Sequence, residues 1–267
     1  MSRLHLFEWE DQPWCPDVFR DYITEHLQFM ARLLGFFDVT VDILVDSLNE
    51  LEATQIVDMC SGGGGPWPSL IDEVASKADI APQVLLTDLY PNTTAFEKIE
   101  KESAGKIKGY SHSASAFDIP GELKGFRTIF TGFHHFKPEH ARKILEDAVA
   151  KNRGIGIFEA QERSLLMVAT IPIGIFFAGL VFTPFVGNLS FKRLFFTYVI
   201  PLCPLVMAWD GFASCLRTYS IEELKELTQD LESEHYHFEM GRIPVPIIPF
   251  PKIKLTYLIG MPKTVVG

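Results

Sequence analysis

The stretch that decides the fold runs from Gln55 to Pro68 and reads Q-I-V-D-M-C-S-G-G-G-G-P-W-P. Its apolar, β-branched start predicts a buried strand that ends at Asp58. The four glycines at 62–65 allow a sharp turn with positive φ angles, and they let a ligand approach the main chain. Pro66 suits the first position of a helix, because its fixed φ angle is already helical. The stretch therefore predicts a strand, a glycine loop and a helix, the start of an α/β nucleotide-binding unit.

A second predicted strand makes a bound nucleotide more plausible than a bare glycine turn. The apolar run 84–87 leads into Asp88, which follows about 30 residues after Asp58. An acidic residue at the end of the second strand can accept hydrogen bonds from ribose hydroxyls. Without this second signal, the glycine run alone is equally compatible with a turn that binds no ligand.

The text from Asp58, D-M-C-S-G-G-G-G-P, resembles motif I of the class I S-adenosylmethionine (SAM)-dependent methyltransferases, h-h-D-x-G-x-G-x-G. Asp58, Gly62 and Gly64 match the motif, and Cys60 replaces its first glycine. A dinucleotide site would instead need G-x-G-x-x-G, and the chain has no proper third glycine after Gly65. An NAD-dependent dehydrogenase is therefore the weaker alternative.

The resemblance extends beyond the glycine loop. It continues through D-L-Y-P-N at 88–92 and F-T-G-F-H-H-F at 130–136, and it covers residues 55–159. The opening text F-E-W-E-D-Q-P-W-C-P at 7–16 also looks like the start of a group of bacterial methyltransferases. The resemblance implies a Rossmann-like α/β sheet and SAM as the cofactor.

The resemblance implies a set of cofactor-binding residues. They are Asp58, Cys60, Gly62, Gly64, Asp88, Leu89, Ser115, Ala116 and Thr131. Within this set, Asp58 is expected to hold the loop or the ligand's ammonium through water, and Asp88 to bind the ribose hydroxyls. The family places an acid where Ser115 stands in S-A-F-D-I-P. Adenine recognition therefore falls to Ser115, the Ala116 main chain or Asp118, and the alternative for Asp118 is a turn acid before Pro120.

His134 and His135 are the predicted catalytic residues. They follow the predicted strand 128–131, at the edge of the sheet where the resemblance places the sulfonium. A histidine titrates near working pH and can act as a general base. A structural role is the alternative, because methyl transfer needs mainly alignment of an already activated methyl group. Two adjacent histidines do not predict a metal site, which needs three or four ligands.

Two further carboxylates are candidates for the pocket. Glu159 ends the fifth predicted strand, 154–159. Asp210 lies in W-D-G, beside a long apolar segment. A carboxylate among apolar residues is either hydrogen-bonded to the main chain or functional, and for Asp210 we favour the first.

Composition limits the partners and the compartment. The net charge of −10 and the pI of about 5.3 give no electrostatic footprint for nucleic acid. The four cysteines form no C-x-x-C pair, which fits a reducing cytosol. Acidic residues among the first eleven argue against an export signal. We therefore expect a cytoplasmic protein, either free or peripheral to the inner face of the membrane.

The chain divides into four predicted segments. They are an N-terminal arm and helical cap (1–54), a SAM-binding Rossmann-like core (55–159), an apolar helical insertion (160–218), and a C-terminal helix with an antiparallel strand pair that completes the core (219–267). The arm, with Phe7, Trp9 and Trp14 among carboxylates, either packs on the domain or forms a lid over the acceptor.

The insertion holds two long apolar runs, 165–187 and 194–209, separated by Lys192 and Arg193. The first run is long enough for a membrane span. Pro172 and Pro184 are expected to interrupt it, and a spanning hairpin would place the two basic residues outside. We therefore expect a helical hairpin that caps the active site, lies in a membrane interface or forms a homodimer contact.

The sequence thus predicts a SAM-dependent methyltransferase that acts on a small, lipophilic acceptor, with a membrane surface as one setting. The alternatives are a soluble small-molecule methyltransferase whose hairpin is a hydrophobic dimer interface, and a non-catalytic SAM-binding protein.

Overall fold

The computed structural model describes residues 1–187, 189–246 and 253–263. The chain forms two compact units, and each unit is built from two separate segments. Unit 1 consists of residues 1–34 and 161–219, and unit 2 of residues 35–160 and 220–267. The prediction had joined residues 35–54 to the N-terminal segment. In the structure they group with the sheet.

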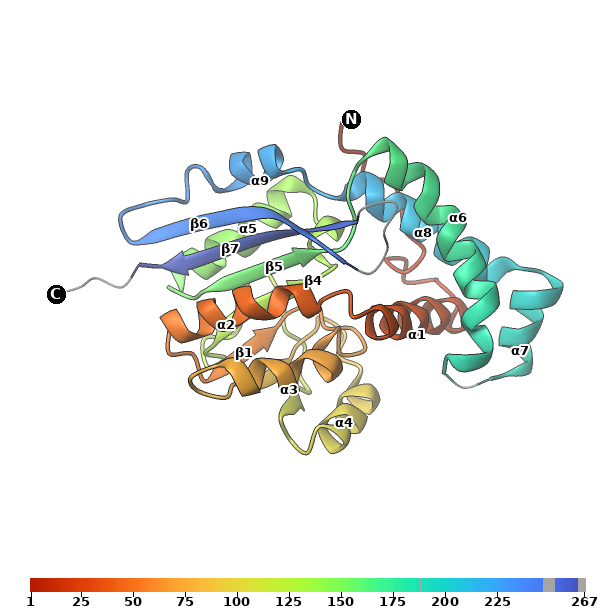
Figure 1. Cartoon of the computed structure of the whole chain (residues 1–267), viewed down its shortest axis with the longest axis horizontal. Coiled ribbons are helices and arrows are strands. Elements are labelled where there is room, and N and C mark those ends of the chain that lie inside the picture. The colour runs from red at the N-terminus through yellow and green to blue at the C-terminus, as the bar shows by residue number, and fades with distance from the viewer. Residues whose placement is uncertain (188, 247–252, 264–267) are drawn as a thin grey trace. The chain divides into compact units, whose positions relative to one another are not determined.

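Unit 2 contains one mixed sheet. Among the described residues its strands are β1 (Gln55–Asp58), β2 (Gln83–Leu86), β3 (Ile107–Gly109), β4 (Phe126–Phe130), β5 (Ile155–Glu159), β6 (Tyr236–Pro244) and β7 (Lys254–Pro262). Their order is β3-β2-β1-β4-β5-β7-β6 (Figure 1). β1 to β5 are parallel, and β7 is antiparallel to both β5 and β6. This confirms the predicted Rossmann-like sheet with its antiparallel end.

Helices cover both faces of this sheet. They are α2 (Val41–Glu50), preceded by the 3₁₀ turn Asp38–Thr40, α3 (Trp67–Lys77), α4 (Thr93–Glu102), α5 (Pro138–Ala150) and α9 (Ile221–Thr228). Helices α2 and α3 lie side by side on one face, and α5 and α9 on the other (Figure 1). β4 and β5 are buried along their whole length, as expected for strands covered on both faces.

Several helix ends follow local sequence signals. Ser220 and Glu223 form the expected capping box at the start of α9. Helix α3 begins at Trp67, one residue later than expected, and Pro66 occupies its N-cap. Helix α4 is not among the predicted elements. Asn92 caps this helix by accepting a hydrogen bond from the main-chain N–H of Ala95 at 3.1 Å.

Unit 1 is helical. It consists of α1 (Asp17–Leu34), α6 (Leu165–Phe182) with the 3₁₀ turn Thr183–Phe185, α7 (Phe191–Leu194) with the π-helical turn Phe195–Val199, and α8 (Leu202–Arg217). Helices α6 and α8 pack closely because Gly179 faces α8: a Cβ there would lie 3.1 Å from the Cβ of Pro204. Tyr22 and Ile23 of α1 pack against Cys203, Val206 and Met207 of α8 and form the core of the unit.

The expectation that Pro172 interrupts the first apolar run is wrong. Pro172 lies inside α6, which continues through it to Phe182. A proline removes one helical hydrogen bond, and α6, which packs against α8, continues in spite of that loss. Pro184 does lie outside the α-helix, in the 3₁₀ turn that follows.

By length and composition alone, one helical stretch of the described chain could cross a membrane. It runs from Leu165 to Phe185, with a mean hydropathy of 2.5. A second pair of helical stretches, Phe191–Val199 and Leu202–Arg217, passes the same test but is bent by 74°.

Candidate functional site

Asp58 closes β1 and anchors the glycine loop. Its Oδ2 atom accepts a hydrogen bond from the hydroxyl of Ser61 at 2.7 Å, and its Oδ1 atom accepts one from the hydroxyl of Thr128 on β4, also at 2.7 Å. The carboxyl group is buried, and burial raises its pKa to about 6 although the two hydroxyls act in the opposite direction. Asp58 therefore joins the loop to the neighbouring strand, which is the first of its two predicted roles.

Two glycines of the loop have different surroundings. Gly64 has a φ angle of +111°, and a side chain there would collide with Ile99 of α4. Gly62 has a φ angle of +50°, and no atom lies within 4 Å of the position that its Cβ would take. Gly64 is thus required by packing inside the protein. Gly62 faces open space in which a ligand could contact the main chain.

Asp88 lies beside this loop, as the parallel pairing of β1 with β2 requires. Its Oδ2 atom accepts a hydrogen bond from the main-chain N–H of Gly62 at 2.9 Å, and its Oδ1 atom accepts one from that of Tyr90 at 2.8 Å. Both carboxylate oxygens are therefore oriented by the main chain. Each keeps a further lone pair that could accept a hydrogen bond from a ligand.

The predicted adenine-binding segment lies next to Asp88. The main-chain N–H of Ala114 donates to the carbonyl of Asp88 at 2.9 Å, and the hydroxyl of Ser113 donates to the carbonyl of Leu89 at 2.8 Å. Leu89 is 49% exposed and Tyr90 is 83% exposed. Apolar surface is therefore available beside the predicted ribose-binding carboxylate.

Ser115, Ala116 and Asp118 differ in their environments. The hydroxyl of Ser115 accepts a hydrogen bond from the main-chain N–H of Phe117 at 3.3 Å, and Ala116 is buried. Asp118 forms an ion pair with Lys151 at 2.6 Å, and this hydrogen-bonded lysine lowers the pKa of its carboxyl group. Asp118 is thereby engaged with the end of α5, which favours the turn-acid alternative for it.

Two residues at the carboxyl ends of β1 and β4 have a left-handed backbone. Cys60 has a φ angle of +57° and Thr131 one of +48°, a region that residues other than glycine rarely adopt. Gly132 brings the two turns close together, since its Cβ would lie 3.6 Å from that of Cys60. Burial, with the nearby carboxylates of Asp88 and Asp58, raises the pKa of the Cys60 thiol. Cys60 therefore remains a neutral thiol at working pH.

Glu159 organises the predicted catalytic pair. His134 and His135 lie in the 3₁₀ turn Phe133–His135 that follows β4. One oxygen of Glu159 accepts hydrogen bonds from the main-chain N–H groups of Phe133 at 2.8 Å and His134 at 3.0 Å. Its other oxygen lies 2.7 Å from Nδ1 of the buried His134 ring. The ring therefore donates from Nδ1 to this carboxylate.

The sequence predicts roles for Glu159 and His134 separately, without their pairing. The signal was available, because parallel neighbouring strands bring their carboxyl ends to one edge of the sheet. β4 pairs with β5, so a residue that ends β5 lies beside the turn after β4. His135 is less buried than His134, and the centroids of the two rings lie 4.3 Å apart.

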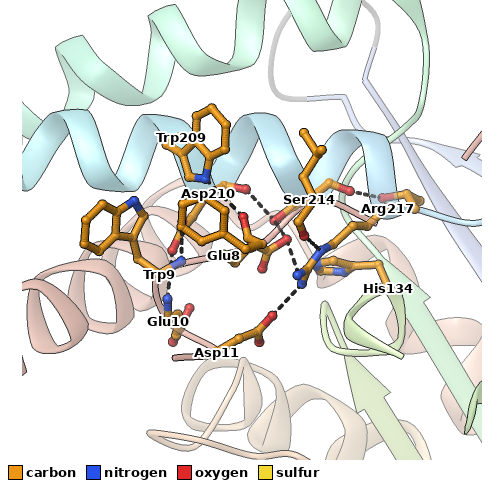
Figure 2. Close-up of polar contacts among 12 residues, drawn as sticks. Glu8, Trp9, Glu10, Asp11, His134, Trp209, Asp210, Ser214 and Arg217 are labelled. Atoms are coloured by element: carbon orange, nitrogen blue, oxygen red, sulfur yellow. Dashed lines mark hydrogen bonds and ion pairs between the residues drawn. The ribbon is translucent and has the colours of Figure 1, made fainter. Parts of the chain in front are cut away.

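Asp210, the remaining candidate, belongs to unit 1, where it fastens the N-terminal arm to α8 (Figure 2). Its carboxyl oxygens accept hydrogen bonds from the main-chain N–H groups of Trp9 at 2.8 Å and Glu10 at 3.1 Å. Burial raises its pKa to about 7 in spite of these bonds. The main-chain interpretation of Asp210 is confirmed.

Arg217, near the end of α8, extends this contact (Figure 2). Its guanidinium lies 3.3 Å from the carboxylate of Glu8 and 2.6 Å from that of Asp11. It also donates to the carbonyl of Leu6 at 2.6 Å. The arm is therefore attached to α8 by buried, charged hydrogen bonds, which are stronger than neutral ones.

Comparison with solved structures identifies the fold as one found in SAM-dependent methyltransferases. The plantazolicin methyltransferase BpumL, in complex with SAH, is 13% identical, with a TM-score of 0.55 over 96% of this chain and 93% of that one. The O-methyltransferase NcsB1 from neocarzinostatin biosynthesis, in complex with SAM and 2-hydroxy-5-methyl naphthoic acid, is 13% identical, with a TM-score of 0.50 over 92% of this chain and 60% of that one.

A third similar structure is the small RNA methyltransferase HEN1, 12% identical, with a TM-score of 0.51 over 85% of this chain and 25% of that one. No protein-family model and no curated protein matches the sequence. The likeness in structure therefore establishes a methyltransferase-type α/β fold.

Proposed function

We propose that this chain is a SAM-dependent methyltransferase that acts on a small, lipophilic acceptor. The observation that carries the proposal is the hydrogen bond between Gly62 and Asp88. It brings an oriented carboxylate, suited to a ribose diol, next to a glycine whose Cβ position is open. These two features fit the cofactor, because they offer hydrogen-bond acceptors and a close approach to the main chain at one sheet edge.

The proposed cofactor-binding residues follow from this arrangement. Asp88 accepts hydrogen bonds from the ribose hydroxyls, and Leu89 with the Ser115–Ala116 segment lies beside the adenine. Gly62, Cys60 and Thr131 line the turns on which the amino-acid part rests. Asp58 and Gly64 act indirectly: Asp58 holds the loop through Ser61, and Gly64 lets the loop pack against α4.

When bound, SAM supplies a methyl group on an activated sulfonium. The chain's own contribution is to align the acceptor, and proximity alone can provide much of the rate. If the acceptor atom carries a proton, Nε2 of His134 receives it. Glu159 orients the ring by accepting the hydrogen bond from Nδ1. Its carboxylate also stabilises the imidazolium that forms when Nε2 takes the proton. His135, its neighbour in the same turn, is the alternative candidate for this role.

A lipophilic small molecule is the acceptor that the chain's composition favours. The apolar segment 165–209 begins six residues after β5, where additions to this fold commonly serve the acceptor. The net charge of −10 disfavours RNA, although HEN1 is a small RNA methyltransferase. The proposed location is the cytoplasm, at the inner face of the membrane. A soluble enzyme with a hydrophobic dimer interface is the competing form.

Calorimetric titration of the full chain with S-adenosylhomocysteine (SAH) tests the cofactor. We expect micromolar binding, at least a tenfold loss in Asp88→Ala, and no loss in Asp79→Ala, an exposed acid of the same unit. A preference for NAD, or equal SAH binding by both variants, would refute the proposal. Methyl-labelled SAM incubated with a lipid extract and with an aqueous extract then tests the acceptor: label in the organic phase supports a lipophilic one. SAH binding without any transfer would indicate a non-catalytic protein.

A further inference from the structure

Unit 1 presents a large exposed apolar surface. Six of its residues, each more than half exposed, define what we name the apolar face: Ile173, Phe177, Val181, Phe185, Phe191 and Val199. Ile173, Phe177, Val181 and Phe185 follow one another at intervals of four residues, so they lie along one side of α6 and the turn after it. The other two come from the next helical stretch, which begins at α7.

The composition of this surface favours lipid hydrocarbon over a protein as the partner that covers it. A surface helix normally turns polar residues outward, and even a homodimer interface is only about two-thirds apolar, with a polar rim. The stretch Leu165–Phe185 has no charged residue on any side, and its mean hydropathy is 2.5 with only 11% of its most apolar window buried. This stretch offers no charge to select a protein surface, and the hydroxyl of its partly exposed Thr170 already donates to the carbonyl of Leu166 at 2.7 Å.

Two exposed polar residues accompany the exposed apolar residues of the stretch 191–199. Lys192 is exposed on α7, and Tyr198 is 48% exposed, with its hydroxyl donating to the carbonyl of Leu180 at 2.9 Å. A lysine and a tyrosine next to exposed phenylalanines match the residue types that occupy the headgroup level of a bilayer. This arrangement suits a surface that enters lipid to a limited depth.

The flanks of α6 exclude a full span for this helix. At its end, Thr183 bonds to Tyr22 and His26 of α1. That helix carries five acidic or basic residues, four of them in the stretch 17–25. Along its length α6 packs on α8, which carries the buried Asp210 and Arg217. A span would bring these charged groups to the depth of the hydrocarbon, where they are costly.

We propose that the apolar face inserts into one leaflet of a lipid bilayer, with α6 lying parallel to the membrane plane. Hydrocarbon burial drives the attachment, and lipid charge contributes little, because the chain itself is strongly acidic. The stretch that carries Phe191 and Val199 also contacts α6, and Tyr198 within it donates to the carbonyl of Leu180 on α6. Because it concerns unit 1 alone, this proposal stands or falls independently of methyl transfer.

Flotation of the full chain with phosphatidylcholine vesicles is the first test. We expect the wild-type chain to float with the vesicles, and the double variant Phe185→Ser/Phe191→Ser to lose at least tenfold in partitioning, since each buried phenylalanine contributes roughly tenfold or more. The matched control is Leu4→Ser/Ile80→Ser, which removes two exposed apolar residues elsewhere. Vesicles with added phosphatidylglycerol should bind no more strongly.

Two results would overturn the proposal. One is a wild-type chain that stays in the aqueous fraction, and the other is equal flotation of the two double variants. Sedimentation equilibrium without lipid identifies the competing occupant: a tight dimer that Phe185→Ser/Phe191→Ser dissociates would assign the apolar face to a second copy of the chain.

Insertion depth separates lying in the membrane from crossing it. Tryptophan introduced as Ile173→Trp or Phe185→Trp is quenched by lipids brominated at defined positions, with the wild-type chain and its four tryptophans as background. An α6 parallel to the membrane places both probes at one shallow depth. A spanning α6 would separate them by about 18 Å along the helix axis, and that result would refute the proposed orientation.

Discussion

The main-chain N–H of Gly62 donates a hydrogen bond to the carboxylate of Asp88 over 2.9 Å. This bond joins the loop after β1 to the loop after β2, whose strands are parallel neighbours. The two most specific residues of the proposed cofactor site are therefore in direct contact with each other. A substitution at either residue should therefore affect SAH binding at the same site.

Gly62→Ala should weaken SAH binding much more than it weakens the fold. Alanine at its φ angle of +50° costs about 1–2 kcal/mol of unfolding free energy, and the new methyl group enters the open space proposed for the ligand. Gly105→Ala is the matched control, because Gly105 also has a positive φ angle, +80°, and no atom within 4 Å of its Cβ position. Calorimetry should show at least a tenfold loss of SAH affinity for Gly62→Ala alone, with similar urea unfolding for both. Equal affinities would remove Gly62 from the site.

Glu159→Gln should lower the free energy of unfolding, and it should no longer fix the ring proton of His134 at Nδ1. The carboxylate accepts two main-chain N–H bonds and one from the imidazole, and the amide can replace only part of this set. We expect a loss of about 1–3 kcal/mol in urea unfolding, against little change for the exposed Glu97→Gln. Nitrogen-15 NMR of the wild-type ring should show the proton at Nδ1. A proton at Nε2 and none at Nδ1 in the wild-type chain would contradict the assigned role of Glu159.

Asp210 should make stability fall as pH rises from about 4 to about 7. Its folded pKa is about 7, well above the ordinary aspartate value of 3.8, so within this window the folded state holds a proton that the unfolded state has released. The stabilisation is fully present below pH 4 and is lost as pH rises through 7. It amounts to at most about 4 kcal/mol. The neighbouring carboxylates Glu8 and Glu10 act in the same direction on this pKa.

The Asp210→Asn variant removes this contribution. Urea unfolding gives the free energy of unfolding at pH 4.5 and at pH 7.5. Its decrease between these two pH values should be larger for the wild-type chain than for the variant, while the contribution of Asp58 is common to both. A carbon-13 carboxyl signal that titrates near 7 and is absent from the variant would assign the group directly. Parallel pH curves for the two proteins would show that Asp210 is ionised throughout.

Two glycines of α6 should respond oppositely to alanine. A Cβ on Gly179 would lie 2.6 Å from the hydroxyl oxygen of Tyr22 and 3.1 Å from the side chain of Met207, so Gly179→Ala should cost about 1–3 kcal/mol. A Cβ on Gly174 meets no atom within 4 Å, and Gly174→Ala should add about 0.5–1 kcal/mol of stability through helix propensity. Thermal unfolding measures both. A tolerated Gly179→Ala would mean that α1, α6 and α8 pack more loosely than the structure has them.

The sheet could be predicted because its signals are local. Each parallel strand is an apolar run bounded by turn residues, and the acidic residues at the ends of β1 and β2 mark the edge where ligands bind. Helix α4 was missed although Asn92 is a good N-cap and Phe96 and Ile99 have helical spacing. Pro172 was misread, because a helix interior that is held by packing tolerates a proline that propensity alone forbids.

The rest depended on contacts between residues distant in the sequence. The bonds from Glu159 to the turn after β4, and from Asp210 to the arm, follow from pairing and packing that no local pattern encodes. The left-handed backbone at Cys60 and Thr131 was equally hidden, because both residue types normally avoid it. The site roles inferred from the resemblance remain predictions for the experiments above.

Unit 1 is assembled from residues 1–34 and 161–219, and this has a consequence for synthesis on the ribosome. Helix α1 leaves the exit tunnel early, but α8, against which Tyr22 and Ile23 pack, is translated roughly 185 residues later. At ordinary elongation rates this interval is about 10–40 s. During it the side of α1 that packs on α8 is open to chaperones, and unit 1 cannot close until α8 has been translated.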